Sequence, residues 1–297
     1  MSDHSHGMRA AGTVWSPDQP LEQHGTGGGG NQARHRGKPV SRPPSEGTQK
    51  KALQPHRSRY WLNDKADERK EERIADICEV YRNASTQVDE ITLSVDEMTG
   101  IQALERIAAD LPMSEGKPVA REFEYKRHGT QTLIAAIRIA LGTVYAHCGD
   151  RRTEADFSWF IEALIQQHPG YKTYHFVLDQ LNTHKSETLV RATARLCGLD
   201  CDLGIKGESG ILKSMETREA FLCKPDKPIV FHYTPKHASW MNQIEIWFGI
   251  LSRKVVKRGN FRSKEELRDK LLAFIDYFNR TLAKPFRWTY QGKPLIA

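Results

Sequence analysis

Three acidic residues in this chain each stand beside an apolar run, and this pattern constrains the fold more than any other feature. Asp96 follows ITLSV, Asp179 follows YHFVL, and Glu245 precedes IWF. The first two runs have the length and residue types of buried strands, so each strand is predicted to end at a carboxylate. Glu245 is predicted to lie near the start of an amphipathic helix over residues 242–258.

The rest of the ordered chain has the pattern of a mixed α/β domain. Strands are expected at residues 90–95, 174–178 and 228–232, and an antiparallel meander of two or three strands between 121 and 148. Helices are expected at residues 66–84, 153–167, 185–196, 211–222, 242–258 and 263–282. This order predicts an α/β fold in which a mixed sheet is flanked by helices.

The chain is predicted to divide into three parts. Residues 1–55 include GTGGGGNQ and almost no periodic apolar positions, so this segment is predicted to be disordered. Residues 56–89 are interpreted as a linker and a helix, and residues 90–297 as one folded domain. No run of about 18 apolar residues occurs, which predicts no membrane-spanning segment. Five irregularly spaced cysteines indicate reduced thiols and a cytoplasmic location.

The charge is concentrated at one end of the sequence. The net charge is +7, and residues 246–297 hold twelve Lys or Arg against four Asp or Glu. Such a bias favours a polyanionic partner, although a basic tail that serves only solubility is the alternative. The predicted helix that carries Glu245 ends in four basic residues expected to contact nucleic-acid phosphates: Arg253, Lys254, Lys257 and Arg258.

Polar residues near the three acids are candidates for supporting roles. Glu97 follows Asp96, and strand alternation is expected to send it to the opposite face. Asn182 and His184 are positioned to order water, a phosphate oxygen or the Asp179 carboxylate, while capping of the next helix is the alternative for His184. Asn242 lies on the same helical face as the third acid. Solvated side chains are the alternative for Asp96, Glu97 and Glu245.

Three carboxylates brought together would form an all-oxygen site of the kind that Mg²⁺ or Mn²⁺ prefers. Two such ions about 4 Å apart support in-line attack on a phosphodiester. The segment GIKGESGILKS lacks the order of a nucleotide-binding P-loop. Cys197, Cys201 and Cys223 lack the paired spacing of a zinc site.

The segments VDEMTGIQALER, VLDQLNTHKS and YTPKHASWMNQIEIWFGILSRK resemble the three acidic blocks of DDE transposases, in particular the bacterial insertion-sequence branch of the Tc/mariner superfamily. The resemblance covers roughly residues 52–290. It implies a ribonuclease-H-like core in which Asp96, Asp179 and Glu245 bind two Mg²⁺ ions. It also implies DNA as the partner, cleavage and joining at terminal inverted repeats, insertion at TA sites, and a homodimer acting on DNA at the bacterial nucleoid.

The chain departs from this family in two places. The interval between Asp179 and Glu245 is 66 residues, about twice the typical value, and the excess is interpreted as an insertion at 198–228. Family members carry N-terminal helix-turn-helix modules, whereas residues 1–50 show no such periodicity. The hypothesis is that this module has been lost.

The resemblance implies a reaction without a covalent enzyme intermediate. One ion, held by Asp96 and Asp179, would activate water or a 3′-hydroxyl, and the other, held by Asp96 and Glu245, would stabilise the leaving oxygen. Two alternatives remain open: an inactive DNA-binding remnant, and a ribonuclease-H-like nuclease that does not join strands.

Overall fold

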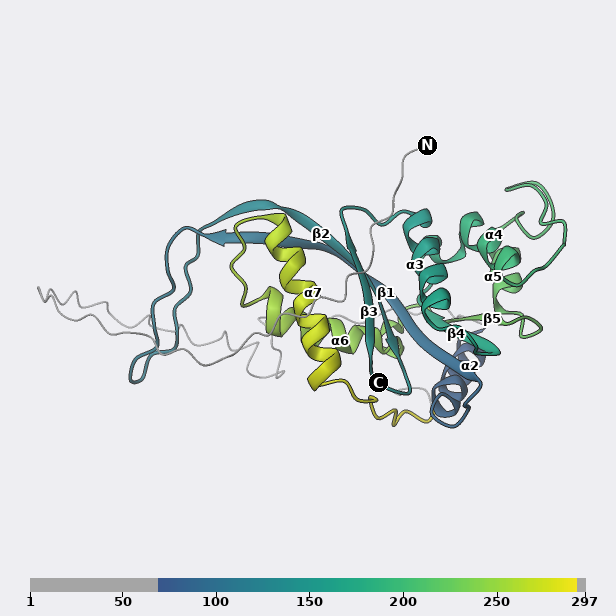
Figure 1. The fold of residues 1–297 in the computed structure, drawn as a ribbon, viewed down its shortest axis with the longest axis horizontal. Helices are drawn as coiled ribbons and strands as arrows, with labels where there is room; N and C mark the ends of the chain where they lie inside the picture. The colour runs from purple at the N-terminus through teal and green to yellow at the C-terminus, as the bar shows by residue number, and fades with distance from the viewer. Residues whose placement is uncertain (1–68, 293–297) are drawn as a thin grey trace, which may run out of the picture. The chain divides into compact units, whose positions relative to one another are not determined.

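The computed structural model describes residues 69–292, and these form a five-stranded mixed sheet with helices on both faces (Figure 1). The strands are β1 (Glu90–Arg106), β2 (Tyr125–Arg138), β3 (Val144–Gly149), β4 (Thr173–Leu178) and β5 (Ile229–Tyr233). Their order across the sheet is β3-β2-β1-β4-β5. The first three strands form an antiparallel meander, and β4 and β5 extend the sheet parallel to β1.

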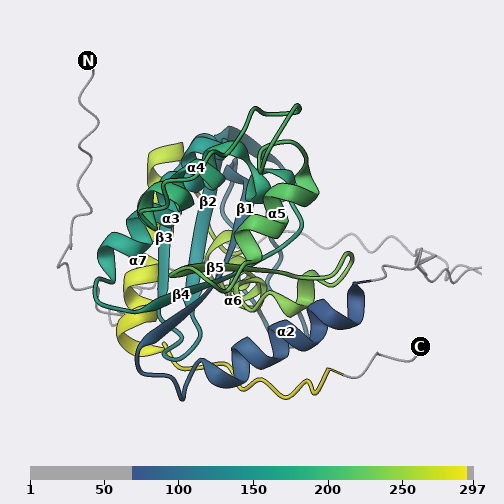
Figure 2. The same cartoon turned by 90° about the vertical axis from the view of Figure 1, so that its right-hand side faces the viewer.

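Strand alternation divides the apolar residues between two cores. On one face, Leu93, Val95 and Phe176 pack against helices α3 (Glu154–Gln167), α4 (Glu187–Leu196) and α5 (Met215–Cys223). The other face is covered by α2 (Lys70–Asn83), α6 (Ile244–Leu251) and α7 (Lys264–Thr281). Figure 2 shows α4 and α5 on the side of the sheet away from α2 and α6. The predicted α/β architecture, a mixed sheet flanked by helices, is thereby confirmed.

Several helix boundaries follow from local capping. Thr153 caps α3, since its side chain accepts from the amide of Asp156 at 3.2 Å and the Asp156 carboxylate accepts from the Thr153 amide at 2.8 Å. Ser186 caps α4 and Ser263 caps α7 in the same general way. The predicted apolar face of α2 is buried: Ile74, Ile77, Cys78 and Tyr81.

Two expectations about element boundaries were wrong. β1 does not end at Asp96 but continues to Arg106, because Met98, Ile101 and Leu104 keep pairing with β2 across two register shifts. The single helix expected over 242–258 is instead α6 followed by a π-helical turn at Ser252–Val256, and a 3₁₀ turn at Ser239–Met241 precedes α6. The loop between β1 and β2 extends from the sheet with small bridges at Leu111–Ala120 and Ser114–Lys117 (Figure 1).

The predicted disordered segment 1–55 and the start of the predicted linker lie outside the described residues. Among the helices of residues 69–292, none combines the length and apolar character needed to cross a bilayer.

Candidate active site

The parallel pairing of β1 and β4 brings two of the predicted acids to matching positions. The last paired residues are Ser94 on β1 and Val177 on β4. Continuing that register by two residues places Asp96 beside Asp179, on adjacent strands whose usual separation is about 4.8 Å. Asp96 is 6% exposed, and Asp179 stands just past the end of β4.

A buried asparagine joins the start of α6 to the first of these acids. The side-chain amide of Asn242 donates to Oδ2 of Asp96 at 3.1 Å and to the carbonyl of Val95 at 3.0 Å. Its side-chain carbonyl accepts from the hydroxyl of Ser94. The Ser94 hydroxyl in turn accepts from the amide of Ile244 at 3.0 Å, the first residue of α6. Asn242 is fully buried, so these bonds fix the helix terminus against β1.

Glu245 is the second residue of α6 and therefore lies close to this junction. Its side chain is more exposed to solvent than that of Asp96, although part of it is covered. Partial burial, and then the charge of Asp179, raise the pKa of Glu245 above its ordinary value. The three predicted acids thus meet at one end of the sheet, from β1, from the segment after β4 and from α6.

Electrostatic repulsion is strongest at Asp96. Burial, and then the charge of Asp179, raise the pKa of Asp96 to about 7, and Glu245 adds to this effect. The hydrogen bond from the amide of Glu97 acts in the opposite direction. A carboxylate in such a position gains from any nearby positive charge.

His184 connects the second acid to Glu97. Its Nδ1 lies 2.7 Å from Oδ1 of Asp179, and its Nε2 lies 3.3 Å from Oε2 of Glu97. Burial acts to lower the pKa of His184, but the two carboxylates outweigh it and raise that pKa to about 9. Burial likewise acts to raise the pKa of Asp179, yet the contact with His184 holds it below its ordinary value. A protonated His184 therefore holds Asp179 ionised.

The predicted supporting residues Glu97, His184 and Asn182 differ in burial and in their contacts with the acids. Strand alternation turns Glu97 to the face opposite Asp96, as expected, where its side chain is buried against His184. Ser186, not His184, caps α4, so the capping alternative for His184 is wrong. Asn182 begins the 3₁₀ turn Asn182–Lys185 and is exposed, so the structure does not bring it into this hydrogen-bonded group.

Two of the four predicted DNA-binding residues lie in the π-helical turn at the end of α6, and the other two follow it directly. Arg253, Lys254, Lys257 and Arg258 are all exposed. The carbonyl of Lys257 accepts from the guanidinium of Arg121, which joins this turn to the loop between β1 and β2. Trp247 is fully buried in the core, whereas Trp240 is 43% exposed and contacts Tyr290 edge-on.

The three acids have the chemistry of a site for a divalent metal ion. Their donor atoms are all carboxylate oxygens, which suit Mg²⁺ or Mn²⁺, and their mutual repulsion would be relieved by a cation. As placed, no three His, Cys, Asp or Glu side chains within residues 69–292 lie close enough to ligate one ion. The chemistry of the site fits the metal, and ligation by all three acids would need a change of side-chain position.

Sequence reasoning missed two residues of this neighbourhood. Ser94 is a fully buried polar residue inside the apolar run ITLSV, and that interruption was the available signal. Lys185 is 5% exposed and donates to Gln180 and Glu219, both at 2.6 Å. A lysine at the start of a predicted helix gives no sign of burial, so its role was not predictable.

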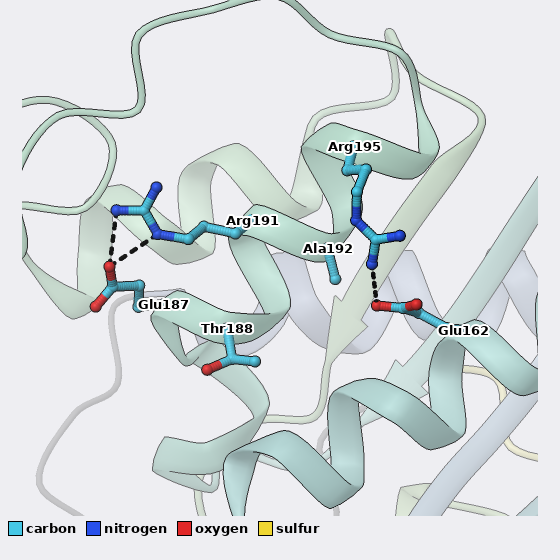
Figure 3. A pocket seen from close by; sticks show the side chains of 6 residues that line it. All are labelled: Glu162, Glu187, Thr188, Arg191, Ala192 and Arg195. Atoms are coloured by element: carbon cyan, nitrogen blue, oxygen red, sulfur yellow. Dashed lines mark hydrogen bonds and ion pairs between the residues drawn. The ribbon is translucent and has the colours of Figure 1, made fainter. Parts of the chain in front are cut away.

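A surface hollow elsewhere does not belong to this site. It encloses about 460 Å³ between α3 and α4 and contains none of the predicted site residues. Arg191 pairs with Glu187 at 2.8 Å, and Arg195 pairs with Glu162 at 2.5 Å (Figure 3). Because these charges neutralise one another, the hollow shows no unpaired charge to attract a ligand.

One family model and several solved structures are similar to this chain. The sequence model of a family described as DDE superfamily endonuclease matches residues 92–268. Among solved structures, the catalytic domain of Mos1 mariner transposase aligns at 12% identity with a TM-score of 0.41, covering 74% of this chain and 90% of that one. The Mos1 mariner paired end complex with Mn aligns at 14% identity with a TM-score of 0.30, covering 75% of this chain and 64% of that one.

A search of the curated proteins found no match. The family match nevertheless spans more than half of the 297 residues and includes all three acids. The chain therefore belongs to the DDE superfamily endonucleases.

Proposed function

We propose that this chain is a DNA transposase that cleaves phosphodiester bonds and transfers strands at the ends of a bacterial insertion sequence of the Tc/mariner type. One observation carries the proposal most directly. The register of β1 and β4 sets Asp96 beside Asp179, while Asn242 ties the start of α6, with Glu245, to Asp96. Three carboxylates from distant parts of the sequence thus share one end of the sheet.

We assign the three acids as the ligands of two Mg²⁺ or Mn²⁺ ions. Bound there, the ions would supply an activated water or 3′-hydroxyl and stabilise the leaving oxygen. Asn242 orients the Asp96 carboxylate through its hydrogen bond of 3.1 Å. His184 keeps Asp179 ionised and oriented, so that this carboxylate is available as a ligand.

The DNA backbone is assigned to the basic surface at the end of α6. Its four exposed cations, Arg253, Lys254, Lys257 and Arg258, lie on the turns that follow the helix carrying Glu245. Phosphates bound there would lead the duplex toward the acids, with an affinity that falls as salt rises. Action as a homodimer on terminal inverted repeats, insertion at TA sites, and a place at the bacterial nucleoid are parts of the same proposal.

The domain organisation belongs to the proposal as well. Residues 90–297 would form the catalytic domain with an insertion at 198–228, and residues 56–89 would supply the linker and helix that precede it.

The products formed from supercoiled plasmid test the proposal. Purified protein is incubated with plasmid and a labelled duplex in Mg²⁺ or Mn²⁺, and denaturing gels separate nicked from joined strands. Nicks together with labelled strands joined to plasmid are the expected result. Nicks alone would favour a nuclease without joining activity, and no product would favour an inactive remnant.

A further inference from the structure

Helix α5 lies in the segment that lengthens the interval between Asp179 and Glu245, and two of its buried side chains contact the loop after Asp179. Glu219 is 6% exposed and Arg218 is 8% exposed, although both are charged. Charged side chains are rarely buried unless they are paired. Their partners therefore indicate what this helix does.

Glu219 makes an ion pair with a buried lysine of that loop. Its Oε2 lies 2.6 Å from Nζ of Lys185, the last residue of the 3₁₀ turn Asn182–Lys185. Its Oε1 lies 2.8 Å from Nη2 of Arg73 on α2. The ammonium group of Lys185 also donates to Oε1 of Gln180 at 2.6 Å and lies over the ring of Tyr233. The ion pair between Lys185 and Glu219 therefore helps to hold both ends of the 180–185 loop.

The side chain of Arg218 binds the backbone of the same loop. Its Nε donates to the carbonyl of Lys185 at 2.7 Å, and its Nη1 donates to the carbonyl of Leu212 at 3.0 Å. Tyr233 adds a hydrogen bond of 2.7 Å to the carbonyl of His184. His184, which contacts Asp179, is consequently held in place from α5 on one side and from β5 on the other.

We propose that α5 is a brace for the loop that carries His184, and that Glu219 and Arg218 are positioning residues for the Asp179 carboxylate. The proposal rests on the proposed function, because it gives the added segment a role at that same site. Neither side chain touches the acids. Each acts through Lys185, which sets the path of the loop, and through His184, which contacts Asp179 at 2.7 Å.

The test compares Glu219→Gln with Glu216→Gln, a change of the same type at an exposed position of the same helix. Arg218→Lys is the second variant, because it keeps a cation on α5 but removes the Nε donor to the Lys185 carbonyl. Amide hydrogen exchange is measured in the full chain for peptides that cover residues 179–186 and, as a folding control, for peptides from β1 and β4.

The expected result for Glu219→Gln and Arg218→Lys is exchange about tenfold faster in residues 179–186, the size expected when local opening no longer breaks a charge-assisted hydrogen bond. Peptides from β1 and β4, and all peptides of Glu216→Gln, should exchange at the parent rate. Plasmid nicking by the two brace variants should fall in kcat with little change in KM for DNA.

Unchanged exchange in residues 179–186 would overturn the proposal whatever the activity. So would equal losses in the brace variants and in Glu216→Gln. Faster exchange in the two brace variants, together with a parent protein that does not cut DNA, would contradict the proposed function and leave the brace supported. The exchange readout thus separates the two failures.

Discussion

The side-chain amide of Asn242 donates a hydrogen bond of 3.1 Å to the carboxylate of Asp96, across 146 residues of sequence. Both side chains are buried, and the same amide also donates to the carbonyl of Val95. This contact couples the position of the first acid to the start of the helix that carries Glu245. The geometry of the site therefore depends on an uncharged residue as well as on its three acids.

Replacement of Asn242 by alanine should impair both activity and stability. The change leaves the Val95 carbonyl, the Ser94 hydroxyl and the Asp96 carboxylate without this partner, at a cost of about 1–3 kcal/mol in the free energy of unfolding. Metal-dependent nicking should fall about 10–100-fold, as is typical when a group that orients a metal ligand is lost. Denaturant unfolding and plasmid nicking measure the two effects. Parent-like nicking by a folded Asn242→Ala protein would contradict the assigned role.

The contact between His184 and Glu97 predicts a partial rescue. Within residues 69–292, His184→Ala removes the only ion-pair partner of the buried Glu97 side chain, and it should lower the free energy of unfolding by about 3–5 kcal/mol. Adding Glu97→Gln removes the uncompensated charge and should restore part of that loss. Nicking should stay low in the double variant, because Asp179 still lacks its histidine. Full recovery of nicking would show that His184 acts only on stability.

Ionisable side chains of β1, β4, β5 and α2 form a row, and this row predicts a pH dependence of stability. His175 lies 2.9 Å from His232 and 3.0 Å from Glu90, and His232 lies 2.8 Å from Asp76. Burial, and then the charge of His232, lower the pKa of His175 below its ordinary value of 6.5. Between the lowered value and 6.5 the unfolded chain binds more protons than the folded chain, so stability should fall as pH falls through this window.

The check is denaturant unfolding from pH 7.5 to pH 5. The parent should lose more stability over this range than His175→Gln, which lacks the titrating ring. Identical pH profiles for the parent and His175→Gln would contradict the prediction.

Exposed cations at the end of α6 should set the salt dependence of DNA binding. Lys254→Gln with Lys257→Gln should weaken binding to any duplex and reduce the slope of log K against log salt by about 1.8, since each phosphate contact contributes roughly 0.9. Lys213→Gln, at an exposed position in the 198–228 segment, is the control. Fluorescence anisotropy at several salt concentrations gives the slopes. An unchanged slope in the double variant would place the DNA elsewhere.

Local sequence patterns were sufficient for most of the fold. The apolar run before Asp179 predicted β4, and apolar periodicity predicted helices close to the observed α2 and α3. The end of β1 was not predictable, because Gly100 and the polar residues around it interrupt the apolar run after residue 95. Such a segment becomes a strand only when β2 supplies its hydrogen-bonding partner.

The candidate acids and several polar residues beside them were predictable from local patterns, but the contacts among them were not. A carboxylate after a buried strand is a local signal, whereas the contact from Asn242 to Asp96 joins residues far apart in sequence. The same holds for Lys185 and Glu219, which meet only because α5 packs beside the loop. No pattern within either segment encodes that contact, so it could emerge only from the folded chain.

The most direct test of the central claim is nicking of supercoiled plasmid by the purified chain in Mn²⁺ or Mg²⁺, beside Asp179→Asn and with a chelator control. The account predicts metal-dependent nicking by the parent, loss of at least about 100-fold in Asp179→Asn, and none with chelator. Equal nicking by the parent and Asp179→Asn, or nicking that survives the chelator, would contradict it.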